Sequence, residues 1–309
     1  MATSEFSVAP YKSFAQDKDK YSIEAVITQP DRPAGRGLNL KFSPIKQVAV
    51  QENRLIFQPE KIRSTESIEF VKKIEPDLII VVAYGQIIPN AILNIPKIAC
   101  LNIHASLLPE FRGPAPIHYA ILQGKKETGI SIIYMNDQLD AGDILIAEKC
   151  PIDSQETFGA LQNRLSLLSV NLIHQAIDLL LQGRAPRRRQ DHSKMSYAPM
   201  LGKAELSIDW NQTALDIFNK IRGLYPWPVA RCWLSSQEVK VIQARLQNTT
   251  ENPGTITHIG KEGIEVAAVQ GSILLQQIQP ASRRVMAAYE YFLGARPPMK
   301  EGDILDSKR

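Results

Sequence analysis

Short apolar runs in the first half of the chain alternate with stretches of helical spacing, and this alternation restricts the fold more than any other feature. Four runs are rich in β-branched residues and bounded by turn residues: Ile23–Thr28, Leu55–Gln58, Leu78–Ala83 and Ile98–Ile103. Such runs predict strands that are buried on both faces. Helical spacing occurs at Ser67–Ile74 and Phe158–Leu181. The alternation predicts a parallel α/β sheet, to which Ile130–Tyr134 and Ile144–Cys150 add two strands.

The character of the sequence changes after Gly183. Residues 184–207 contain an arginine run, two prolines and many polar residues, which is typical of a linker. A helix is expected at Thr213–Arg222, followed by close-set strands at Ala230–Leu234, Glu238–Leu246, Gly254–Ile259, Gly263–Val269 and Ser272–Ile278. These strands predict a small antiparallel barrel or sandwich. A length of 309 residues favours two domains, and we expect them at 1–189 and 209–309 with a linker at 190–208.

Composition excludes several classes of protein. The longest strongly apolar run, Leu78–Ala83, is too short to cross a bilayer, and the N-terminus lacks the pattern of a secretory signal. The three cysteines are scattered, which argues against a disulfide framework or a cysteine zinc site and favours a cytoplasmic setting. Net charge is only +4, although basic residues gather at 32–46 and 184–189. Charge alone favours a solvated surface over a polyanion site by about two to one.

The densest chemical pattern is Asn-Ile-His-Ala-Ser-Leu-Leu-Pro-Glu-Phe-Arg-Gly at residues 102–113. It begins at the carboxyl end of a predicted strand, the edge at which α/β sheets bind ligands. Alternation places Asn102 and His104 on one face of that strand. An amide and an imidazole can stabilise an oxyanion and transfer a proton. The chain has no nucleophile elbow, so direct attack by an external nucleophile fits better than a covalent acyl-enzyme.

A second polar segment, Asp-Ala-Gly-Asp at residues 140–143, follows the strand predicted at Ile130–Tyr134. A carboxylate here could orient the imidazole of His104 and favour its protonated form. Taken singly, each of these residues is ordinary, because such a histidine is more often a packing residue and such a segment is a plausible plain turn. From the residues alone, a catalytic site and a purely structural role are equally supported, and neither defines a substrate.

The two segments together resemble the signature of the folate-dependent formyltransferases. The resemblance implies that Asn102, His104 and Asp140 are catalytic. It implies that N10-formyltetrahydrofolate is the formyl donor, that no metal is needed, and that the fold is Rossmann-like and doubly wound. The residues expected to line the folate site are Ser106, Leu107, Leu108, Pro109, Val82, Tyr84 and Gly85.

The segment Thr-Gln-Pro-Asp-Arg-Pro-Ala-Gly-Arg-Gly at residues 28–37 has no regular period and is expected to be a loop. It resembles an insertion found in family members that formylate methionyl initiator tRNA. The resemblance continues at Ile208–Trp210 and Arg222–Pro228, and it implies an OB-like β-barrel as a tRNA-binding C-terminal domain. The residues expected to contact tRNA are Arg36, Lys41, Arg32, Lys203 and Arg222. Trp227, between two prolines, is expected to anchor a core.

The N-terminus departs from the family pattern. Residues 2–6, Ala-Thr-Ser-Glu-Phe, match a turn that normally follows the first strand of the sheet, so the resemblance predicts a domain lacking that strand. Either the translation start is misplaced and the true protein is longer, or the protein is truly truncated, and we expect a misplaced start. If the N-terminus is incomplete, a mitochondrial or plastid origin stays open.

The resemblance implies transfer of the formyl group to the α-amine of methionyl initiator tRNA by a monomer with no membrane partner. Two alternatives stay open, namely a related formyltransferase or hydrolase with another acceptor, and a non-catalytic RNA-binding relative.

Overall fold

The computed structural model describes residues 1–34, 39–234, 237–295 and 297–305, and in it the chain forms two compact units. The first unit comprises residues 1–116, 127–151 and 162–199, and the second comprises 117–126, 152–161 and 200–309. The two units therefore exchange short segments. Residues 190–199, which the sequence suggested as part of a linker, pack within the first unit; for example, the Arg112 amide donates to the Ser196 carbonyl.

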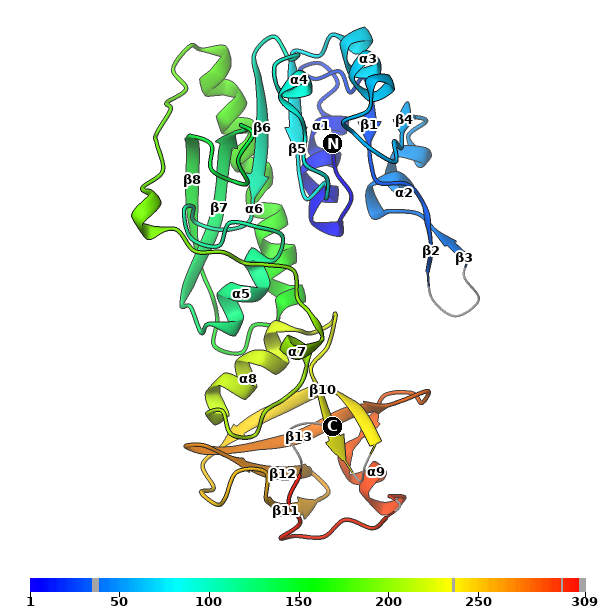
Figure 1. Ribbon diagram of the computed structural model, residues 1–309, viewed down its shortest axis with the longest axis vertical. Coiled ribbons are helices and arrows are strands. Elements are labelled where there is room, and N and C mark those ends of the chain that lie inside the picture. The colour runs from blue at the N-terminus through cyan, green and yellow to red at the C-terminus, as the bar shows by residue number, and fades with distance from the viewer. Residues whose placement is uncertain (35–38, 235–236, 296, 306–309) are drawn as a thin grey trace. The chain divides into compact units, whose positions relative to one another are not determined.

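The first unit is built on a mixed β-sheet that is divided into a two-stranded part and a four-stranded part (Figure 1). Its strands are β1 (Val26–Ile27), β4 (Ile56–Phe57), β5 (Leu78–Val81), β6 (Ala99–His104), β7 (Glu127–Tyr134) and β8 (Ile144–Pro151). β1 pairs with β4 and β5 with β6 in parallel, whereas β7 runs antiparallel to both β6 and β8. The predicted Rossmann-like α/β domain is confirmed, but the expectation of a wholly parallel sheet is wrong at β7.

Two residues at the N-terminus connect the halves of this sheet. The Ala2 amide donates to the Ile27 carbonyl on one side, and the Val82 amide donates to the Met1 carbonyl on the other. Ala2 thus forms a parallel bridge with Val82, directly after β5, and a hydrogen bond to Ile27 of β1. Among residues 1–34, no strand precedes β1.

The helices of the first unit are α1 (Val8–Gln16), α2 (Pro44–Gln51), α3 (Thr65–Ile74), α4 (Asn90–Leu93) and most of α6 (Phe158–Leu181), with 3₁₀ turns at Glu5–Ser7 and His192–Lys194. Serine side chains cap two of them, since Ser43 accepts from the Lys46 amide and Ser64 from the Ser67 amide. By length and composition alone α6 could cross a membrane, but core helices pass the same test, and Leu161, Leu165 and Ile173 are fully buried.

The Pro- and Gly-containing segment that was expected to be a loop is in part a β-hairpin. β2 (Arg32–Ala34) and β3 (Asn39–Lys41) pair antiparallel, with Arg32 opposite Lys41. Asp31, at its base, is paired with Lys46 and accepts a hydrogen bond from Gln58 at 3.0 Å. The prediction of a loop is wrong at residues 32–34, because proline is tolerated in an edge strand, and residues 35–37 of the predicted loop lie outside the described residues.

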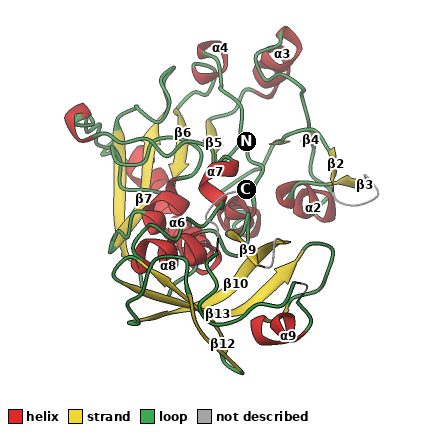
Figure 2. Cartoon of the chain, turned by 60° about the horizontal axis from the view of Figure 1, so that its bottom comes forward, coloured by secondary structure: helices red, strands yellow, loops and turns green. Residues whose placement is uncertain are grey.

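The second unit is an antiparallel sheet with strand order β11-β12-β13-β10-β9 and with β14 beside β13. Figure 2 shows the long strands β10 and β13 side by side. The strands are β9 (Arg231–Leu234), β10 (Gln237–Gln247), β11 (Ile256–Gly260), β12 (Gly263–Ala268), β13 (Gly271–Pro280) and β14 (Met286–Ala287). Its helices are α7 (Lys203–Leu206), α8 (Ala214–Gly223), α9 (Ala288–Leu293) and, from Ile117 onward, α5 (Pro116–Leu122), whose first residue belongs to the first unit. The predicted antiparallel β domain is confirmed.

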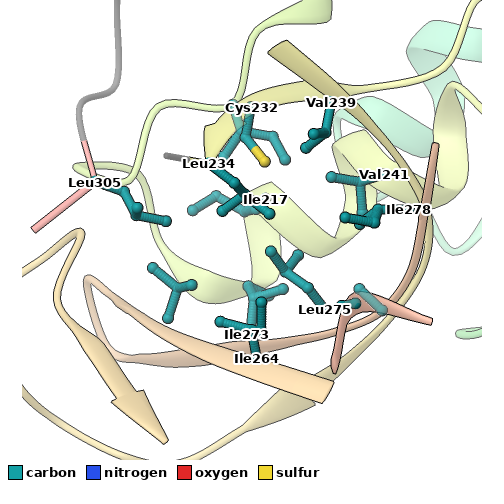
Figure 3. Close-up of a cluster of buried hydrophobic side chains, with 14 of the residues drawn as sticks. Ile217, Cys232, Leu234, Val239, Val241, Ile264, Ile273, Leu275, Ile278 and Leu305 are labelled. Atoms are coloured by element: carbon teal, nitrogen blue, oxygen red, sulfur yellow. The ribbon is translucent and has the colours of Figure 1, made fainter. Parts of the chain in front are cut away.

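One apolar core holds the second unit together (Figure 3). Ile217 from α8 points at side chains of the sheet, including Leu234, Val241 and Leu275, and all four are fully buried. Trp210 is buried in this core, whereas Trp227 is 71% exposed. The expectation that Trp227 anchors a core is therefore wrong.

Candidate active site

Asn102, His104 and Asp140 converge at one end of β6. Asn102 and His104 lie on the last three residues of this strand and are 8% and 5% exposed. Asp140 lies in the connection between β7 and β8. The Asn102 Nδ2 donates to Asp140 Oδ1 at 3.1 Å, and His104 Nδ1 lies 3.5 Å from Asp140 Oδ2. The structure thus brings together three polar side chains that the sequence separates by up to 38 residues.

The carboxylate of Asp140 is held from several sides. Besides the Asn102 amide, the backbone N–H of Gly113 donates to Asp140 Oδ2 at 2.8 Å. The Asp140 side chain is only 12% exposed, and its backbone adopts a φ of +48°, in the left-handed region. A left-handed backbone at a residue other than glycine is strained and persists only where its surroundings fix it. Asp140 is therefore a fixed acceptor facing His104. The other acidic residues of this connection, Asp137 and Asp143, have no contact with the pair.

The imidazole of His104 lies between two oxygen acceptors. Its Nε2 is 2.9 Å from the Phe111 carbonyl oxygen, and its Nδ1 faces the Asp140 carboxylate. A carbonyl oxygen can only accept, so Nε2 carries a proton in this arrangement. With Nε2 committed to Phe111, Nδ1 is the ring atom that can serve a reacting group beside Asp140.

Two buried serines fix the conformation of the loop after β6 through hydrogen bonds. Ser106 Oγ donates to the Glu110 carbonyl at 2.6 Å, and Ser131 Oγ on β7 donates to the Ser106 carbonyl at 2.8 Å. The Leu108 amide in turn donates to Ser131 Oγ at 3.1 Å. Ser106 and Leu108 are buried, whereas Leu107 and Pro109 are partly exposed. Leu107 and Pro109 are thus the members of this predicted folate-lining segment whose side chains can meet a ligand.

In the turn after β5, two side chains are buried while the backbone of the neighbouring residues is exposed. Val82 and Tyr84 are 4% and 2% exposed, and Tyr84 belongs to the apolar cluster around Ile79 and Ile92. Ala83 and Gly85 are exposed and have φ values of +45° and +86°. A ligand at this turn would therefore meet the backbone of residues 83–85 rather than the Val82 or Tyr84 side chains. The turn lies at the carboxyl edge of the sheet, beside the end of β6.

The basic residues predicted to contact nucleic acid lie in different surroundings. Arg32 on β2 is exposed, with a 3.9 Å contact to Glu60, and Lys203 is exposed at the start of α7. Lys41 lies on β3, and Arg36 lies outside the described residues. Exposed ion pairs of this kind contribute about 0–1 kcal/mol, so Arg32 can leave Glu60 for another partner.

Arg222 is an interior residue of the second unit. It is 6% exposed. Its Nε donates to Asn219 Oδ1 at 2.9 Å, and its Nη1 donates to the Glu156 carbonyl at 2.8 Å and the Asp153 carbonyl at 3.2 Å. The expectation that Arg222 contacts a phosphate is not supported, because its guanidinium is already used to hold the turn before α6.

Two further residues near Asp140 were missed by the sequence reasoning. Gln190 donates to the backbone carbonyls of Asp140 and Gly142, and Arg112 donates to Gln190. Arg112 lies in the pattern at residues 102–113, whereas nothing in the sequence marks Gln190. Within the described ranges, no group of three or more His, Cys, Asp or Glu residues could hold a metal ion.

Comparison with known proteins defines the class to which this fold and site belong. The formyl transferase family model matches residues 2–177, and the model of the formyl transferase C-terminal domain matches residues 200–296. Methionyl-tRNA formyltransferase of Bacillus subtilis is 41% identical over 99% of this chain and 96% of its own length. That of Geobacter sulfurreducens is 40% identical over 96% and 93%. The chain therefore belongs to the formyl transferase family, in the group of the methionyl-tRNA formyltransferases.

Solved structures with lower identity share the fold. The sugar 3N-formyl transferase WlaRD aligns with a TM-score of 0.66 at 18% identity, covering 92% of this chain and 97% of its own. HypX from Aquifex aeolicus, solved with tetrahydrofolic acid, aligns with a TM-score of 0.61 at 16% identity over 84% of this chain and 47% of its own.

Proposed function

We propose that the protein transfers the formyl group of N10-formyltetrahydrofolate to the α-amine of methionyl initiator tRNA. The observation that carries the proposal is the convergence of Asn102, His104 and Asp140 at the carboxyl end of β6. Near-full-length similarity to methionyl-tRNA formyltransferases supports the choice of acceptor. The proposed setting is the cytoplasm, with the protein acting as a monomer.

The proposed chemistry is a direct transfer. The amine attacks the formyl carbon, a C–N bond forms, and a tetrahedral oxyanion results. The second N–H of the Asn102 amide and the Nδ1–H of His104 stabilise this oxyanion. Asp140 orients His104 and, through a water, accepts the proton of the attacking amine and returns it to N10 as the bond from N10 to the formyl carbon breaks. Atoms balance without an oxidant or a metal ion.

The proposed folate site lies along the same edge of the sheet. Leu107 and Pro109 offer partly exposed apolar contacts, and the exposed residues Ala83 and Gly85 leave their backbone accessible to a ligand. In open α/β sheets, ligands bind outside the carboxyl ends of the strands where the strand order reverses. The position of Ala2 between β1 and β5 places this reversal next to the turn at residues 83–85.

In the first unit, the proposed tRNA contacts lie on the hairpin β2–β3. The hairpin carries the exposed Arg32 and, on β3, Lys41. Leu40, the residue before Lys41 on β3 and opposite Pro33, is 65% exposed, and Phe42 is 42% exposed. Basic residues next to exposed apolar and aromatic ones can bind phosphates and unpaired bases at a nucleic-acid end. Lys203 adds a phosphate contact from the second unit.

Transfer of labelled formyl from formyltetrahydrofolate tests this function. The protein is incubated with methionyl initiator tRNA, with an aminoacylated elongator tRNA, or without tRNA. Label on the initiator tRNA alone is the expected result. Release of free formate in every reaction would identify a hydrolase, and the absence of turnover with intact RNA binding would identify a non-catalytic relative.

Arg222 and Lys203 are expected to respond differently to substitution. Arg222→Met should lower the free energy of unfolding by about 2–3 kcal/mol, because two carbonyls and the Asn219 side chain lose a charged donor.

Lys203→Ala should leave the free energy of unfolding unchanged but weaken tRNA binding. It should also reduce the slope of log K against the logarithm of the salt concentration by about 1. Denaturant unfolding and binding titrations at several salt concentrations measure both. A salt slope that changes with Arg222 and not with Lys203 would reverse the assignment.

A further inference from the structure

The side-chain carboxamide of Gln190 connects a buried cation to the turn that carries Asp140. Its Nε2 donates to the carbonyl oxygens of Asp140 and Gly142, each at 2.8 Å. Its Oε1 accepts from Arg112 Nε at 3.1 Å and from Arg112 Nη2 at 2.6 Å. Gln190 is 6% exposed and Arg112 is 3% exposed, so water does not compete for these hydrogen bonds.

These contacts fix the orientation of the carboxamide. The Gln190 amide has one end that only donates and one end that only accepts. Arg112 has no acceptor group to offer, and the carbonyls of Asp140 and Gly142 have no donor. A flip of the amide would place donor against donor and acceptor against acceptor. Gln190 therefore has one stable orientation, and in that orientation both of its N–H groups are used on the Asp140 turn.

Arg112 is held in turn by groups other than carboxylates. Besides Gln190, the guanidinium contacts His192 Nδ1 at 3.4 Å and Met195 Sδ at 3.8 Å, and no carboxylate among the described residues pairs with it. Hydrogen bonds from a charged donor are stronger than those between neutral groups. The hydrogen bonds from Arg112 therefore hold the Gln190 carboxamide firmly in place. The Arg112 backbone is itself fixed, because its amide donates to the Ser196 carbonyl.

The turn that receives this support is under strain. Asp140 has a φ of +48°, a left-handed backbone conformation that costs free energy at a residue other than glycine. The carboxylate of Asp140 reaches His104 and Asn102 only while the backbone keeps this conformation. The backbone carbonyls of Asp140 and Gly142, on either side of Ala141, both accept hydrogen bonds from Gln190, which therefore holds the backbone of this turn.

We propose that Gln190, held by Arg112, is a positioning residue for Asp140: its carboxamide fixes the left-handed turn and so keeps the carboxylate against His104 and Asn102. This inference rests on the proposed function, because it assigns Gln190 a role through Asp140. The segment at residues 190–199 then contributes a residue to the site of the first unit, in addition to connecting the two domains.

The test is steady-state formylation by the full chain carrying Gln190→Met or Gln190→Glu. Methionine keeps the volume and removes all four hydrogen bonds. Glutamate keeps an acceptor for Arg112 and gains charge attraction, but it cannot donate to the two carbonyls. Both variants are expected to lower kcat about 10- to 100-fold with KM for donor and tRNA unchanged, because a displacement of about 1 Å costs that much.

The glutamate variant separates positioning from a merely structural role. If Gln190 serves only to accept the hydrogen bonds of the buried Arg112, Gln190→Glu will fold stably and turn over normally, and this result would overturn the proposal. Gln182→Met is the matched control, since Gln182 is exposed in the first unit and its side chain accepts a hydrogen bond from the exposed Arg184. It should have wild-type kcat and unfolding midpoint.

A second pair of variants tests the coupling and separates the two proposals. Arg112→Met combined with Gln190→Met should be no slower than Gln190→Met alone, because both act on one contact. Asp140→Asn is measured alongside. Normal turnover in Asp140→Asn would reject the proposed function of Asp140 itself. A slow Asp140→Asn protein beside a normal Gln190→Met protein would reject only the positioning role.

Discussion

Asp140→Asn is expected to lower kcat about 10²–10⁴-fold, the range for loss of a general acid–base group. Asparagine keeps the size of the side chain and can still accept the Gly113 N–H with its oxygen. Its amide nitrogen would then face the Asn102 Nδ2, which is also a donor. It can no longer attract the His104 imidazolium or take a proton from the attacking amine. The loss should therefore appear in the chemical step, and single-turnover measurement of formyl transfer is the assay.

Asp137→Asn is the matched control for this prediction. Asp137 is an exposed carboxylate in the same connection between β7 and β8, and it has no contact with His104 or Asn102. It should turn over like the unaltered protein. Binding of formyltetrahydrofolate should persist in both variants, which shows that the site is formed. An Asp140→Asn protein whose single-turnover rate matches that of Asp137→Asn would remove Asp140 from the proposed mechanism.

The strand positions and part of the site followed from local patterns. Alternation along a strand places residues two apart on one face, so Asn102 and His104 could be paired from spacing alone. The start of α6 at Phe158 and its end at Leu181 agree with the predicted range, because a long amphipathic period is the strongest local signal. α2 was missed although Ser43 followed by Pro44 is a regular helix start.

Other features depend on contacts that no local pattern records. The direction of β7 is one, since a run of apolar residues shows a strand but not whether it runs parallel to its neighbour. Gln190 is another, because it meets Asp140 from 50 residues away. The burial of Arg222 and Trp227 also could not be read from residue type. Arg222 was expected at the surface but is buried, and Trp227 was expected in a core but is exposed.

Gly142→Ala is the second substitution expected to have a large effect. A Cβ at this position would overlap the carbonyl oxygen of Tyr134, and no rotation can move a Cβ away from a backbone atom. The Tyr134 amide also donates to the Asp143 carbonyl at 3.0 Å, so the two chain segments cannot separate without losing a hydrogen bond. We expect a loss of about 3 kcal/mol, at the upper end for overpacking, and a lower midpoint in denaturant unfolding.

The same substitution should also slow formyl transfer in the fraction that folds. The Gly142 carbonyl accepts one of the two hydrogen bonds from Gln190, so displacement of Gly142 moves the Asp140 turn. We expect kcat per folded protein to fall about 10²-fold. Gly183→Ala is the control, since Gly183 has a φ of +65° but no atom within 4 Å of an added Cβ. It should cost about 1–2 kcal/mol from backbone strain and leave kcat unchanged. Equal turnover in the two variants would show that the glycine of this turn serves the fold alone and that its backbone does not help to position Asp140.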